Sequence, residues 1–145
     1  MKKTVPVLLG LAALFALATG FRGGCGGHRH DPASIDRMVT AHLEDALEDL
    51  DATPAQKGQV MALKDRVLQK GLALRQGGQE TKKALVAQWD SASPDRAAVH
   101  ALVDARIDAM RAFAHEAADA AVDLHGILTP EQRAKISKKV HRHME

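Results

Sequence analysis

The sequence contains little that would stabilise a thick globular core. It has a single cysteine, Cys25, so no disulfide can form within the chain. Aromatic residues make up only 3% of the chain, with no tyrosine, one tryptophan and three phenylalanines. The core must therefore be built from leucine, valine, isoleucine, methionine and alanine, which favours closely packed helices. No stretch shows the period-two alternation of a half-buried strand, so we expect an all-α protein.

The chain also lacks a strong excess of one charge and a long apolar run. Its 20 lysine and arginine residues and 18 aspartate and glutamate residues give a formal net charge of +2. Removal of Lys2 and Lys3 with an N-terminal signal takes this charge to zero, so bulk charge predicts no nucleic-acid partner. The apolar run from Val5 to Ala18 is shorter than the roughly 20 residues that span a bilayer.

The N-terminal region is typical of an exported protein. Residues 1–20 have two lysines, an apolar segment and then small residues, as in a signal peptide, which predicts a periplasmic location. Residues 21–31 are rich in glycine and histidine and are expected to form a disordered leader. Two alternatives stay open. Cys25 can carry a lipid, although Arg22 stands where such signals have an apolar residue, or Val5 to Phe21 can remain as an anchor.

Two copies of a helix-start signature stand out in the remainder of the chain. The first consists of Thr53, Pro54 and Gln56, and the second of Thr129, Pro130 and Gln132. Threonine is a good N-cap, and proline fits the first helical position because no amide bond is lost there. A glutamine three residues after the threonine can reach back to the amide of the cap, which completes a capping box. Two such boxes with the same proline suggest two related helical halves.

Apolar periodicity predicts one domain over residues 32–142, with 143–145 as a tail. We expect an elongated antiparallel hairpin of four to five helices. Their expected ranges are Pro32–Leu50, Thr53–Arg75, Gln79–Trp89, Pro94–Leu124 and Thr129–His141. Gly77 and Gly78 should cause a kink or short break between the second and third ranges, since each glycine costs a helix roughly 1 kcal/mol. Ser93 is expected to cap the longest helix, Pro94 to open it and Gly126 to end it.

The longest helix carries a continuous apolar line. Its members recur at spacings of three and four: Val103, Ile107, Met110, Ala114, Ala117, Ala121 and Leu124. Such a line is too long to face water, so we expect it to pack on the first two helices. Its alanines allow a partner helix to approach closely, and we expect a homodimer.

A secreted helical domain with two such boxes resembles the Spy/CpxP family of bacterial periplasmic proteins. The family signature is Leu-Thr-x-x-Gln, which the second box matches fully from Leu128 to Gln132. The first box departs from it, with Ala52 in place of the leucine. The resemblance covers residues 32–142 and implies a cradle-like homodimer. It further implies an ATP-independent chaperone, a modulator of envelope stress that acts with a sensor kinase, or a heavy-metal (Zn, Cu or Ni) binder or sensor.

A chaperone needs a surface that binds unfolded proteins loosely, and the second helix offers a candidate. Met61, Leu68 and Leu72 form an apolar line turned away from the line of Val60, Leu63 and Val67, and basic residues surround it, among them Lys57, Lys64 and Arg75. Methionine repacks readily, and long basic side chains add apolar contact while their charge stays hydrated. The alternative is that this second line forms the dimer seam.

The metal alternative rests on histidine. His28 and His30 lie in the leader near Cys25, and His141 and His143 lie at the C-terminus. Imidazole with thiolate suits Zn or Cu. On a helix, however, residues two apart point in different directions, so neither pair forms a helical site. We therefore expect no obligatory cofactor, with Zn or Cu binding as the alternative.

No feature of the sequence predicts an enzyme. It lacks a nucleophile turn, a glycine-rich phosphate loop within the helical domain, and paired carboxylates beside an obvious pocket. The last helix is strongly basic toward its C-terminus, where the helix dipole favours cations. Two interpretations of that charge stay open: a solvated, well-capped helix and a basic surface that contacts a partner.

Overall fold

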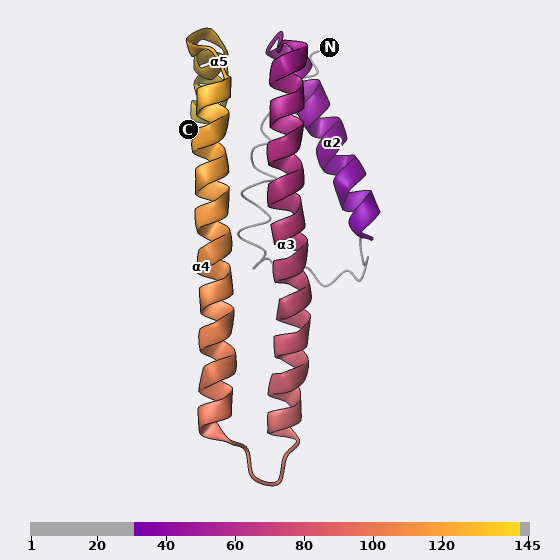
Figure 1. Cartoon of the computed structure of the whole chain (residues 1–145), viewed down its shortest axis with the longest axis vertical. Coiled ribbons are helices and arrows are strands. Elements are labelled where there is room, and N and C mark those ends of the chain that lie inside the picture. Colours follow the sequence, from indigo (N-terminus) through magenta and orange to yellow (C-terminus); the bar gives the residue numbers. More distant parts are fainter. Residues whose placement is uncertain (1–30, 143–145) are drawn as a thin grey trace.

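The computed structural model describes residues 31–142, and within this range the chain is all α. Helix α2 spans Pro32–Asp49, α3 spans Pro54–Trp89, α4 spans Arg96–Ile127 and α5 spans Pro130–His141. Helices α3 and α4 run antiparallel as a long hairpin, α2 lies along one half of α3, and α5 follows the end of α4 (Figure 1). The signal peptide, the leader and the tail assigned from the sequence lie outside the described residues, apart from Asp31.

The core is thin and lies between helices in two clusters. The first joins α2 to α3 through Val39, Leu43, Leu47 and Val60, and Leu124 and Ile127 at the end of α4 pack against it. The second joins α3 to α4 and consists of Val67, Phe113 and Ala120. Both clusters are aliphatic except for Phe113, as the small aromatic content predicts.

The α3–α4 contact has a defined register that two glycines make possible. A Cβ added to Gly71 would lie 3.4 Å from the ring of Phe113, and one added to Gly78 would lie 3.0 Å from the guanidinium of Arg106. The two glycines are seven residues apart, and so are their partners. The Arg106 Nη1 also donates a 2.6 Å hydrogen bond to the carbonyl of Leu74. Glycine therefore serves close helix approach at both positions.

The expected break at Gly77 and Gly78 is wrong, because α3 continues through both as one helix of 36 residues. The cost of a glycine within a helix is offset at Gly78 by the contact with Arg106. A Cβ at Gly77 would meet no atom within 4 Å, so that glycine serves no comparable contact.

The two ends of α4 also differ from expectation. Asp95, rather than Ser93, caps the helix and accepts hydrogen bonds from the amides of Ala97 and Ala98 at 2.8 and 3.3 Å. Aspartate is as good an N-cap as serine, and Pro94 therefore lies in the turn. At the other end Gly126 is helical, and the helix continues to Ile127.

The apolar line of α4 does not pack on α2 and α3 as expected. Val103, Ile107 and Met110 are 41%, 47% and 38% exposed. The face that packs on α3 instead carries Arg106, Phe113 and Ala120, about a quarter turn away around the helix. Only the last member of the line, Leu124, packs against the α2–α3 cluster.

The adjacent glycines of α3 provide a matched test of this register. Gly77→Ala should raise the free energy of unfolding by up to about 1 kcal/mol, because the new methyl group meets nothing and alanine favours helix. Gly78→Ala should gain nothing or lose stability, since its methyl group displaces the guanidinium of Arg106. Urea unfolding of both variants measures the difference. Equal gains in the free energy of unfolding would contradict the close contact between Arg106 and Gly78.

Candidate functional site

Both helix-start signatures form the expected capping boxes. In the first, the Gln56 amide donates to the Thr53 hydroxyl at 3.2 Å, and the Thr53 amide donates to Gln56 Oε1 at 2.9 Å. In the second, the Gln132 amide donates to the Thr129 hydroxyl at 3.3 Å, and the Thr129 amide donates to Gln132 Oε1 at 2.9 Å. Pro54 and Pro130 occupy the first helical positions, and Leu128 is buried ahead of the second box.

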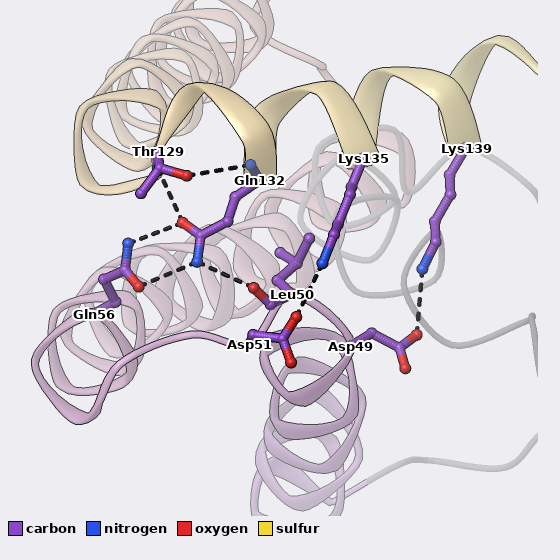
Figure 2. A network of polar contacts seen from close by, with 8 residues as sticks. All are labelled: Asp49, Leu50, Asp51, Gln56, Thr129, Gln132, Lys135 and Lys139. Atoms are coloured by element: carbon purple, nitrogen blue, oxygen red, sulfur yellow. Dashed lines mark hydrogen bonds and ion pairs between the residues drawn. The ribbon is translucent and has the colours of Figure 1, made fainter.

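The two boxes meet in space, which their sequence spacing does not reveal. Gln56 Nε2 donates to Gln132 Oε1 at 2.9 Å, and Gln132 Nε2 donates back to Gln56 Oε1 at 3.2 Å (Figure 2). Each glutamine also reaches the end of a helix in the other half. Gln56 Nε2 donates to the Ile127 carbonyl at 2.9 Å, and Gln132 Nε2 donates to the Leu50 carbonyl at 3.1 Å.

This glutamine pair is buried and fully hydrogen-bonded. Gln56 and Gln132 are only 9% and 7% exposed. Each amide oxygen accepts two hydrogen bonds and each amide nitrogen donates two, which is the full capacity of the group. The signature is thus a structural device that joins the α2–α3 and α4–α5 junctions.

The basic side chains of α5 are largely engaged at the same junction. Lys135 pairs with Asp51 at 3.0 Å and Lys139 pairs with Asp49 at 3.2 Å, both at the end of α2 (Figure 2). Arg133 donates to carbonyls at the end of α4, those of His125 and Leu128, at 2.9 and 2.8 Å. Of the two interpretations of this charge, these contacts favour the well-capped structural helix.

On α3, Lys64 forms an ion pair with α2, and Arg66 forms ion pairs with α4. Burial lowers the pKa of Lys64, but hydrogen bonds to Asp36 and Asp65 outweigh it and leave that pKa above its usual value. The ammonium therefore stays charged at neutral pH, and the stability it contributes would be lost only as the pH rises through that raised pKa. Arg66 pairs with Glu116 at 2.6 Å and with Asp123 at 2.9 Å, and thereby ties α3 to α4.

The structure does not present the six candidate client-binding residues as one exposed surface. Arg75 is exposed, but Lys64 and Leu68 are buried, and the other three, Lys57, Met61 and Leu72, are half-buried. Met61 packs against the α2–α3 cluster, and Lys64 pairs with Asp36 of α2. Because α2 folds over this part of α3, the line is only partly accessible.

The exposed apolar surface lies nearer the tip of the hairpin. At seven-residue spacing, the line of Met61 and Leu68 continues through Arg75 and Lys82 to Trp89, which is 85% exposed. Half-exposed Val86 lies 18 residues, or five helical turns, after Leu68 and so on the same side of α3. With Val103, Ile107 and Met110 of α4, these residues form what we call the open face: Val86, Trp89, Val103, Ile107 and Met110.

The proposed metal ligands gain no support from their placement. His28, His30 and His143 lie outside the described residues, and His141 is exposed at the end of α5. Within residues 31–142, no group of three or more histidine, cysteine, aspartate or glutamate side chains is placed to hold an ion.

A comparison of the sequence with known protein families finds a family that is defined by the same motif. The LTXXQ motif family matches residues 38–139, which is most of the chain. The chain belongs to the LTXXQ motif family. This family includes Spy/CpxP-like periplasmic proteins. No curated protein and no solved structure matches the chain. None of the four described helices carries an apolar stretch long enough to cross a membrane.

The glutamine pair predicts an order of mutational effects. Thr53→Ala or Thr129→Ala should each lower the free energy of unfolding by about 1 kcal/mol, the usual value of a cap. Gln132→Ala should cost about 1–3 kcal/mol, because it leaves buried groups of Gln56 and the Leu50 carbonyl without partners.

Denaturant unfolding of both single glutamine variants and of the double variant Gln56→Ala/Gln132→Ala measures the coupling. Because each glutamine bonds the other, the double variant should lose less than the sum of the two single losses. Lys135→Ala serves as a control at the same junction, with a loss below about 1 kcal/mol for its exposed ion pair. Additive losses would show that the glutamines do not act as a pair.

Proposed function

We propose that this protein is an ATP-independent periplasmic chaperone that binds unfolded or stress-damaged envelope proteins. The observation that carries the proposal is the open face, an apolar surface on the half of the hairpin that α2 leaves uncovered. Trp89 at 85% and Val86 at 51% exposure are unusually accessible for large apolar residues. A monomer that leaves such a patch in water usually uses it for binding.

The composition of the open face suits loose binding of varied clients. Trp89 offers a large apolar surface with a polar N–H. Exposed Lys82 and Arg96 lie nearby on α3 and α4 and can attract acidic segments. Affinity would come from apolar burial, and charge would mainly raise the rate of encounter.

We further propose that the protein is a homodimer and that the apolar line of α4 takes part in its seam, which leaves Val86 and Trp89 of α3 as the part of the open face that binds clients. Val103, Met110, Ala117 and Leu124 recur every seven residues, as in helices that pair lengthwise. The outer edge of the line carries both signs of charge, with Asp104 and Asp108 beside Arg111, so two antiparallel copies would meet with complementary charges. Heavy-metal binding and a sensor-kinase partner remain alternatives, and no contact among the described residues favours them.

Substitutions on α3 test the client surface without touching the α4 line. The variant Val86→Ser/Trp89→Ser should suppress the aggregation of an unfolded client several-fold less well than wild type, because apolar contact area is lost. Light scattering of a denatured client diluted without nucleotide measures this. Val122→Ser is the matched control, since Val122 is 71% exposed but lies on the outer side of α4. Full activity of the double variant would contradict the proposed face.

A charge on α4 tests the seam. Ile107→Glu should convert a dimer into monomers at micromolar concentration, because the seam would bury two unpaired carboxylates. Sedimentation velocity measures the change, and circular dichroism checks that the helices persist. Val122→Glu, which places the same charge off the line, should leave the dimer intact. A wild-type protein that sediments as a monomer would contradict the dimer.

A further inference from the structure

Helix α2 is held very differently at its two ends. At its C-terminal end, the Leu50 carbonyl accepts from Gln132, and Asp49 and Asp51 pair with lysines of α5. In its N-terminal half, the polar contact of α2 with α3 is made by Lys64, whose Nζ lies 2.6 Å from Asp36 Oδ1 and 3.1 Å from Thr40 Oγ1. The first end can thus stay in place while the second leaves α3.

The lysine under α2 does not depend on α2 alone for its counter-ion. Lys64 is 6% exposed and also lies 2.6 Å from Asp65, its exposed neighbour on α3. If α2 moves away, the ammonium keeps Asp65 and regains water, so no buried charge is left unpaired. A helix that covers Lys64, however, must offer it an acceptor, because burying a charge without a partner is costly.

The packing beneath α2 is also incomplete. A mostly enclosed apolar cavity of about 40 Å³ lies between α2, α3 and α4, with Leu43, Leu47, Val60, Val67 and Leu124 among its lining residues. Side chains beside an empty space forfeit part of their dispersion contacts. The lining residues from α2 begin at Leu43, so the cavity adjoins the point at which the N-terminal half of α2 would separate from the anchored end.

We propose that the N-terminal half of α2 is an exchangeable occupant of its seat on α3, formed by Val60, Met61 and Lys64, and that an acidic amphipathic helix of a client binds there in its place. This half of α2 shows what the seat accepts: apolar residues at four-residue spacing, Ile35, Val39 and Leu43, with a carboxylate at Asp36. The seat continues along α3 into the open face, so a client held near Trp89 can extend into it. This inference rests on the proposed chaperone function and adds the kind of segment that is bound.

A labelled peptide of residues 32–44 is the probe, added to the full mature protein and followed by fluorescence anisotropy. It should bind Asp36→Asn protein at least about tenfold more tightly than wild type, because the weakened internal helix competes less for the seat. Asp49→Asn is the matched control, since it removes a carboxylate from the anchored end of α2 and should leave peptide affinity unchanged. A peptide of scrambled sequence should not bind.

Hydrogen exchange of α2 amides accompanies the binding measurement and should be faster in Asp36→Asn, with α4 unchanged. If that variant fails to fold, Thr40→Val replaces it, because it removes only the 3.1 Å contact with Lys64. Absence of peptide binding in a folded variant with faster exchange would overturn the proposal. So would exchange of α2 between two copies, seen as concentration-dependent association of the variant beyond the oligomeric state of the wild type that excess peptide does not disrupt. The assay contains no client, so its outcome is independent of aggregation suppression through Val86 and Trp89.

Discussion

A primary amide side chain can accept two hydrogen bonds and donate two, and burying it is costly unless those positions are filled. At the junction of this protein, Gln56 and Gln132 fill all of them with each other, with the two threonine caps and with the carbonyl ends of two helices. Four helices are therefore positioned relative to one another by one pair of side chains. The ends of α2 and α4 and the starts of α3 and α5 could not shift independently without leaving a buried polar group unpaired.

The local part of this arrangement was predictable, and the long-range part was not. Each capping box depends on the spacing of a threonine and a glutamine three residues apart, which a sequence displays directly. The contact between Gln56 and Gln132 depends on how the hairpin folds, and a sequence of one chain carries no sign of it. Duplication of the box was the available hint, since two identical caps with the same proline imply related environments.

The errors in the sequence analysis have a common physical origin. Apolar periodicity identifies a face of a helix but not the neighbour that covers it. The line of Val103 and Met110 was therefore assigned to the intramolecular core, although the packed face carries Arg106 and Phe113. Likewise, the line of Met61 on α3 was considered for clients or for the dimer seam, although α2 covers part of it. At Gly78 the helix propensity of glycine was weighed without its partner Arg106, whose guanidinium requires the absent side chain.

The turn and the glutamine junction lie at opposite ends of the α3–α4 pair (Figure 1). The pair is consequently a ring, closed by peptide bonds at one end and by hydrogen bonds at the other. When the hydrogen-bonded end opens, the turn keeps the separated segments at high effective concentration, so that closure remains an intramolecular event. If a protease cuts the turn, which is exposed at Ser91 and Ser93, the junction and the ion pairs of Arg66 still hold the two fragments together. This double closure means that a single cut in the turn does not separate the two long helices.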